Sequence, residues 1–170
     1  MQVCLIRHPR PCIAAGMCYG RLDIDAEEVA DTCARLRPRL PVGVPVICSP
    51  LRRARALAEA IDPKAVTDAR LVELDFGNWE GRPWEGIARE ELDAWAADVL
   101  HFTPPGGESV ARLAQRAISF ATSLSVPQVI IVTHAGVMRA LVGHWRGLPA
   151  AVWTTLQFDY GSLTELDISP

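Results

Sequence analysis

The sequence has little net charge and no long hydrophobic run. Its formal net charge is −3, from 17 basic and 20 acidic residues, whereas proteins that bind a nucleic-acid backbone carry a basic surface. We therefore expect no nucleic-acid partner, and any phosphate recognition must be local. The first apolar run is only Val3–Ile6, and no later run approaches the roughly 18 residues of a membrane span. We expect neither a signal peptide nor membrane association, and we predict a cytoplasmic protein.

The cysteines also lack the spacing typical of a disulfide-bonded or zinc-binding domain. There are five, an odd number, and no CxxC spacing joins any two of them. A disulfide framework and a structural zinc site are therefore not predicted. The cysteines are expected to be reduced, with two of them buried in strands (Cys4 and Cys48).

Three short apolar segments indicate strands that are covered on both faces. They are Val3–Ile6, Pro45–Cys48 and Val129–Val132, and helical patterns alternate with them. Unbroken apolar runs of this length are typical of a parallel sheet. Since 170 residues suffice for one domain, the sequence predicts a single α/β domain over 1–170, a three-layer α/β/α sandwich with a mostly parallel central sheet.

Capping signals place the helices between these strands. Ser49-Pro50 predicts a helix start, with an apolar face that ends near Asp62-Pro63. Ser109 follows the turn-rich "TPPGGE" and predicts the cap of a helix to about residue 124. Further helices are expected over 25–36 and from about Gly136. The stretches 154–158 and 162–168 predict a hairpin or a pair of edge strands.

Charged side chains follow three of the predicted strands. Arg7 and His8 end the first, Ser49 to Arg53 follow the second, and His134 follows the third. Ligands of open α/β sheets bind beyond the carboxyl ends of the strands. A lone histidine there is more often a structural hydrogen-bonding group, but three distant segments that converge on one edge predict a shared site. Arg53 lies about 200° around its helix from Leu51 and can face that edge, whereas Arg52 and Arg55 are expected on the surface.

One carboxylate from the stretch "RLVELDFGNWEG" is expected to join this site. Apolar residues alternate with Glu73 and Asp75, so an extended segment would turn both carboxylates away from the core. Local pattern alone does not decide between Glu73, Asp75 and Glu80, and Glu80 could simply cap a loop.

Two arginines and two histidines predict an anion site without a metal. Arginine's planar fork suits phosphate oxygens, and a neutral imidazole can attack phosphorus while an acid protonates the leaving alcohol. A metallohydrolase is the competing hypothesis. Its HExxH, HxH and HxD spacings are missing among the four histidines, and nearby arginines would repel a cation. His101 and His144 are therefore expected on the surface, and no metal or other cofactor is predicted.

The motifs "LIRHP", "CSPLRRARALAEAI", "LVELDFGNWEG", "PPGGES" and "VTHAGVMRAL" together resemble the histidine phosphatase superfamily, in its phosphoglycerate-mutase-like branch. They occur in that family's order and run from residue 5 to residue 141. The resemblance implies that His8 is the phosphorylated nucleophile and that Arg7, Arg53 and His134 bind the phosphoryl group. It also implies that Glu73 is the general acid, which resolves the choice among the three carboxylates.

Two prolines depart from the family's pattern. The family usually has RHG and a threonine or a similar residue two positions later, where this chain has Pro9 and Pro11. Each proline removes a backbone donor to phosphate, so efficiency could be reduced. The loop "CYGRLDID" corresponds to a family loop, and Tyr19, Arg21 and Asp23 could border the pocket.

The short chain favours a phosphatase over a mutase. Family mutases insert extra segments around the pocket, for which 170 residues leave no room. The motif set is most similar to alpha-ribazole phosphatases of cobalamin synthesis, so a small phosphorylated metabolite is the expected partner. A phosphoglycerate-mutase-type transferase, a weakly active phospho-ligand-binding regulator and a phosphohistidine-protein phosphatase stay as alternatives. Residues of about 80–107, with Trp84 and Trp95, are expected to cap the pocket or to form a homodimer surface.

Overall fold

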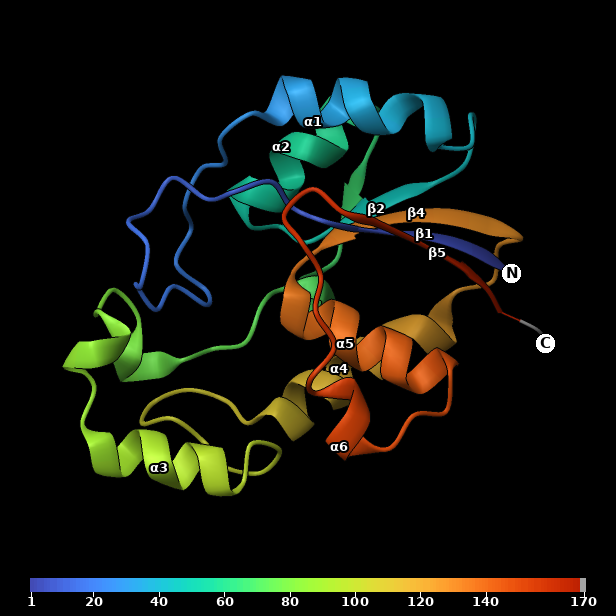
Figure 1. The fold of residues 1–170 in the computed structure, drawn as a ribbon. Coiled ribbons are helices and arrows are strands. Elements are labelled where there is room, and N and C mark those ends of the chain that lie inside the picture. The colour runs from blue at the N-terminus through green and yellow to red at the C-terminus, as the bar shows by residue number, and fades with distance from the viewer. Residues whose placement is uncertain (169–170) are drawn as a thin grey trace.

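The computed structural model describes residues 1–168 and contains one five-stranded sheet (Figure 1). The strand order is β3-β2-β4-β1-β5. Neighbouring strands pair in parallel except β5, which runs antiparallel to β1 along the edge. The prediction of a mostly parallel sheet is confirmed. The strands are β1 (Gln2–Arg7), β2 (Val46–Cys48), β3 (Val66–Thr67), β4 (Gln128–Thr133) and β5 (Leu163–Asp167).

Helices cover both faces of this sheet, as the three-layer prediction required. On one face lie α1 (Val29–Leu36) and α2 (Arg52–Ile61), and on the other lie α4 (Val110–Ser123), α5 (Ala135–Trp145) and α6 (Ala150–Trp153) (Figure 1). Alternate residues of a strand face opposite layers. Leu5 of β1 therefore joins the buried cluster under α4 and α5, and Ile6 joins the cluster under α1 and α2. None of the described helices is long and apolar enough to cross a bilayer.

A third, aromatic cluster lies outside these two layers. Between β3 and α4 the chain forms the short helix α3 (Arg89–Ala97) and the 3₁₀ turns η2 (Ala69–Leu71), η3 (Gly77–Trp79) and η4 (Trp84–Gly86); another turn, η1 (Arg37–Arg39), follows α1. The rings of Trp84 and Trp95 stack 5.7 Å apart at 6°, and both pack with the buried Trp79. These tryptophans cover one another, so they provide no evidence for a homodimer surface.

Two of the helix predictions begin too early. The first expected helix, over 25–36, begins only at Val29. Ala26 forms an isolated bridge with Pro11, and Glu28 has a left-handed backbone with φ 51°, which is incompatible with a continuous helix. The second begins at Arg52, because Leu51 is still extended. The Ser49 hydroxyl accepts from the Leu51 amide at 3.3 Å, one residue before the helix begins.

The C-terminal hairpin prediction is wrong in its first half. Within the described chain, only β5 forms a strand there, and residues 154–158 follow the single turn of α6, which begins after Pro149. Ser109 caps α4 as expected, since its hydroxyl accepts from the amide of Arg112. Cys48 is buried as expected, whereas Cys4 is only partly buried, and all five thiols are free.

Candidate active site

The carboxyl ends of β1, β2 and β4 bring two histidines and a serine to one edge of the sheet. The amide of His8 donates to the carbonyl of Thr133 at 3.0 Å, and the amide of Ser49 donates to Val132 at 3.0 Å. These bonds extend the strand pairing by one residue, so the positions just beyond the strands are fixed. The rings of His8 and His134 lie 5.0 Å apart, and both side chains are at most 1% exposed.

Burial and hydrogen bonding fix the protonation state of His8. Its Nδ1 lies 2.6 Å from the carbonyl oxygen of Pro9, which can only accept, so Nδ1 carries the proton and Nε2 has a free lone pair. Burial, then the charge of Arg53 and more weakly that of Arg7 lower the pKa of His8 to about 3, although the Pro9 bond acts in the opposite direction. His8 is therefore a neutral imidazole at neutral pH.

His134 lies at the N-cap of α5 and contacts Ser49. Its Nε2 is 2.7 Å from the Ser49 hydroxyl, while its Nδ1 is buried without a hydrogen-bond partner among residues 1–168. Burial, followed by the effects of His8 and Arg53, holds the pKa of His134 well below its usual value. Both imidazoles are thus uncharged, and each has one ring nitrogen left for a ligand, Nε2 in His8 and Nδ1 in His134.

Arg7 and Arg53 supply positive charge that no carboxylate neutralises. Arg53 is fully buried, and its guanidinium donates to the carbonyls of Gly20 at 2.6 Å and Leu22 at 2.7 Å. Arg7 donates to the Phe158 carbonyl at 2.7 Å. In the part of the chain that the structure describes, neither arginine has a carboxylate within 4.0 Å, and both Nε atoms are buried without a partner.

Of the three candidate carboxylates, that of Glu73 contacts the first turn of α5. Its Oε2 accepts from the Gly136 amide at 3.2 Å and its Oε1 from the Leu74 amide at 3.0 Å. A Cβ atom on Gly136 would lie 2.4 Å from Oε1, so only glycine permits this approach. The charge of Glu73 also raises the pKa of Arg53 against the effect of burial, consistent with proximity of the two groups.

Asp75 and Glu80 stabilise the neighbouring loops instead. Asp75 accepts from the Gly77 amide at 2.9 Å and lies 3.5 Å from Arg21. Glu80 Oε1 accepts from the amides of Arg21 and Phe76 at 2.8 and 3.0 Å, which is the loop-capping role considered for it. His101 and His144 are exposed, as predicted.

Tyr160 is a residue of this site that the sequence did not indicate. Its hydroxyl is 2.7 Å from that of Tyr19, its ring centroid is 5.6 Å from His8, and the Arg7 guanidinium stacks on the ring at 3.8 Å. We call Tyr19 and Tyr160 the tyrosine latch. The segment "FDYGSL" resembles an ordinary turn, and only the tertiary fold brings it beside His8.

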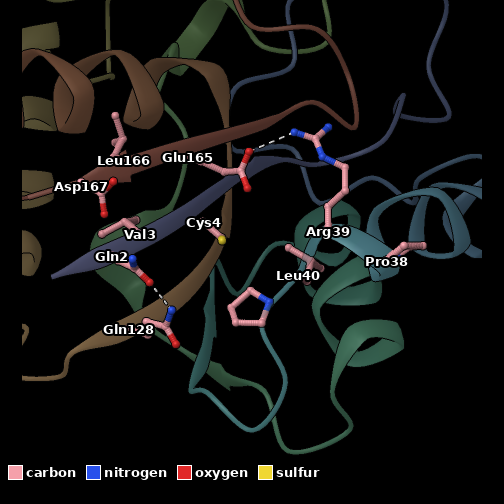
Figure 2. A pocket seen from close by; sticks show the side chains of 11 residues that line it. Gln2, Val3, Cys4, Pro38, Arg39, Leu40, Gln128, Glu165, Leu166 and Asp167 are labelled. Carbon is pink, nitrogen blue, oxygen red and sulfur yellow. Dashed lines mark hydrogen bonds and ion pairs between the residues drawn. The ribbon is translucent and has the colours of Figure 1, made fainter.

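A larger hollow in the described part of the chain lies elsewhere. About 440 Å³ opens beside the amino-terminal half of β1, where Gln2, Cys4 and the ion pair of Arg39 with Glu165 line it (Figure 2). It contains none of the candidate groups, and we assign it no role. Two smaller hollows, of about 130 and 150 Å³, both have Glu73 in their wall. Among residues 1–168, no cluster of three histidine, cysteine or acidic side chains could hold a metal ion.

A comparison with family models decides the family. The model of the histidine phosphatase superfamily (branch 1) matches residues 3–170. The chain belongs to the histidine phosphatase superfamily. Members of this superfamily are phosphatases or mutases, and the relatives of this chain include proteins named as phosphatases and proteins named as mutases.

Curated relatives within the superfamily are distant but cover most of the chain. The adenosylcobalamin/alpha-ribazole phosphatase of Escherichia coli is 29% identical over 73% of this chain, a match that spans 66% of that enzyme, just under two thirds. A probable phosphoglycerate mutase of Yersinia enterocolitica is 31% identical over 98% of this chain and 85% of its own length. The solved structure of the mycobacterial glucosyl-3-phosphoglycerate phosphatase in complex with VO3 is 28% identical to this chain, with a TM-score of 0.84. The match covers 98% of this chain and 92% of that one.

Proposed function

We propose that this protein hydrolyses a small phosphate monoester through a covalent phosphohistidine on His8. The proposal rests mainly on the protonation state of His8, a neutral, buried imidazole whose Nδ1–H donates to the Pro9 carbonyl at 2.6 Å. Its Nε2 lone pair is therefore available, and Arg7 and Arg53 lie nearby without a carboxylate. A phosphate dianion would neutralise both cations, so a nucleophile and an anion site occur together.

The proposed reaction has two steps that use only side chains and water. Nε2 of His8 attacks phosphorus, the ester P–O bond breaks, and the leaving oxygen takes its electron pair and a proton from the Glu73 carboxyl. Water then attacks the phosphohistidine and gives a proton back to Glu73, which releases phosphate and neutral His8. Arg7, Arg53 and His134 bind the equatorial oxygens, where charge accumulates in the transition state. Treatment with a chelator is therefore expected to leave the rate unchanged.

Alpha-ribazole phosphate is one candidate substrate. The motif set, together with the named activity of the Escherichia coli relative, supports this choice. Near-complete burial of His8 and Arg53 favours a small molecule over a phosphorylated protein, because a protein side chain could not reach the imidazole without carrying a bulky backbone to it. A screen of phosphorylated metabolites, including alpha-ribazole phosphate and 3-phosphoglycerate with a bisphosphate donor, distinguishes a phosphatase from a mutase.

A second candidate is a phospho-ligand-binding protein of low turnover. Arg53 is occupied by the carbonyls of Gly20 and Leu22, and the Tyr160 ring, held by Tyr19, packs beside His8. Substrate entry must replace these contacts, which would slow turnover more than binding. Measuring both phosphate binding and hydrolysis of the same ester distinguishes slow turnover from no turnover.

The test of the proposed function is labelling of His8. Wild-type protein is mixed with a phosphate monoester, quenched in alkali and digested, and the phosphate is expected on His8, stable to base and labile to acid. His8→Ala should lose the label and the hydrolysis of an aryl phosphate. If wild type and His8→Ala hydrolyse that ester equally slowly, the enzymatic proposal fails and the binding role gains support.

A further inference from the structure

Three partly or fully buried arginines lack an ionic partner. Of the five arginines that are not exposed, Arg70 and Arg116 form ion pairs with carboxylates. Arg7, Arg53 and Arg139 have no carboxylate within 4.0 Å among residues 1–168. Buried charges in proteins are normally paired. The phosphoryl group of the proposed substrate accounts for the first two, and Arg139 is left without a counterion.

Arg139 lies on α5, the helix that begins directly after His134. The described part of the chain provides it with one hydrogen bond, from Nε to the Leu156 carbonyl at 2.7 Å. Burial lowers its pKa, the charge of Glu73 raises it, and the charge of Arg7 lowers it again. Arg139 and Glu73 lie in the wall of the same cavity, and neither His8 nor His134 lines that cavity. Arg139 therefore lies beside Glu73, on the side of the site where the leaving group would be.

A cavity of about 130 Å³ connects Arg139 with Glu73. The other walls are mostly apolar and come from α3, α4, α6 and the segment after Glu73. The indole Nε1 of Trp95, in one wall, is a buried donor without a partner in residues 1–168. We call this cavity the leaving-group pocket; the wall residues used in the argument are Leu74, Phe76, Trp95, Leu113, Arg139 and Trp153.

The size and chemistry of this pocket define what it could hold. An apolar cavity of roughly 150 Å³ accepts a benzene-sized molecule, and aromatic walls favour a flat ring. An argininium without a counterion favours a carboxylate, which its fork can bind with two hydrogen bonds. The other hollow beside Glu73, lined by Met17, Tyr19 and Trp84 among others, contains no cation.

From this arrangement we infer that the leaving group is an alcohol with a compact apolar or aromatic frame and a carboxylate that binds Arg139. Among the candidate substrates this disfavours alpha-ribazole phosphate, which has no carboxylate. The inference rests on the proposed function, because a general acid at Glu73 must face the ester oxygen. The alcohol then extends past Glu73 into the adjoining cavity. The pocket would thus determine which phosphate monoesters are hydrolysed, while His8 and its neighbours act on the phosphoryl group that all of them share.

The test compares esters that differ only in one charge. Carboxybenzyl phosphate, as the better of its 3- and 4-isomers, is compared with the matching carbamoylbenzyl phosphate, which has the same size but no charge. A charge-assisted hydrogen bond is expected to raise kcat/KM for the carboxylate by about 10- to 100-fold. Arg139→Gln should bring this ratio close to one, and Arg139→Lys should restore part of it.

Arg112→Gln is the matched control. Arg112 is an exposed arginine on α4, outside the pocket, and its replacement should keep the wild-type ratio. Hydrolysis of both esters without a preference by wild type would overturn the inference but leave the proposed function intact. This holds even if Arg139→Gln does not fold, which circular dichroism would reveal. No hydrolysis of either ester and no label on His8 would instead contradict the proposed function.

Discussion

The contribution of His8 to the free energy of unfolding depends on pH. In the folded protein its pKa is lowered to about 3, chiefly by burial, whereas an unfolded chain titrates near the ordinary value of about 6.5. Between these two values the unfolded state binds a proton that the folded state does not. The free energy of unfolding therefore decreases as the pH falls through this window. The same burial keeps the imidazole neutral, as a nucleophile requires.

The first prediction uses this window. Between pH 7 and pH 4.5, the His8 contribution to the free energy of unfolding should fall by about 2–3 kcal/mol. His8→Gln should lack that contribution and show a shallower pH dependence, while His134 still contributes in both proteins. Urea unfolding at several pH values measures the difference. Parallel pH profiles for wild type and His8→Gln would show that His8 titrates normally in the folded protein.

The tyrosine latch leads to a second prediction at the level of a single atom. Tyr160→Phe removes the hydroxyl that lies 2.7 Å from Tyr19 but keeps the ring on which Arg7 stacks. Losing one hydrogen bond should lower stability by about 1 kcal/mol and ease opening of the site. We expect kcat/KM for an aryl phosphate to rise up to about fivefold. A decrease of tenfold or more would instead indicate that the hydroxyl binds substrate.

At the scale of elements, α4 holds the Glu73 segment in place. Residues 72–76 belong to no strand. The Arg116 guanidinium, on α4, donates to the carbonyls of Arg70, Val72 and Glu73 at 2.6–3.0 Å. It also pairs with Glu108 at 2.6 Å. An extended segment outside the sheet thus gains from one side chain the backbone partners that a neighbouring strand would provide.

The third prediction makes Arg116 a positioning residue for Glu73. A lysine keeps the charge of Arg116 but cannot span three carbonyls with fixed geometry. Arg116→Lys should lower kcat for a poor alkyl leaving group roughly 10- to 100-fold, with a much smaller effect on an acidic nitrophenyl leaving group, which needs no proton. Arg112→Lys, on the same helix, should change neither. Equal losses for both esters would indicate a general structural defect.

Features that depend on neighbouring residues in the sequence could be predicted, whereas features that depend on contacts between distant segments could not. The strands β1, β2, β4 and β5 and Ser109 as a cap depend on local pattern and were predicted, whereas the two-residue strand β3 was not predicted and the strand expected over 154–158 is absent. The helix expected from residue 25 failed because Ala26 pairs with Pro11, a contact between segments that no periodicity encodes. Tyr160 and Arg139 have ordinary sequence surroundings. Their importance comes from neighbours brought together only by folding.

At the scale of the whole molecule, the aromatic cluster is separate from the two cores that flank the sheet. Trp79, Trp84, Trp95 and Phe102 pack mainly on one another, and Phe76 connects them to the core under α4. This segment also provides Trp95 to the leaving-group pocket. A unit with its own apolar centre can open without unfolding the rest. We therefore propose that the expected cap at about 80–107 unfolds as a cooperative unit separate from the sheet.

The last prediction tests that independence. Trp79 is fully buried at the centre of the cluster, and Trp79→Ala should cost about 3–5 kcal/mol locally. If the cap is a separate cooperative unit, amide hydrogen exchange should accelerate over residues 79–102 while the amides of β1 and β4 keep their protection. Trp145→Ala, which removes a tryptophan packed against the main core, should instead weaken protection in the sheet. If Trp79→Ala accelerates exchange equally in the cap and the sheet, the two form one unit, and the substrate pocket cannot open independently of the fold that positions His8.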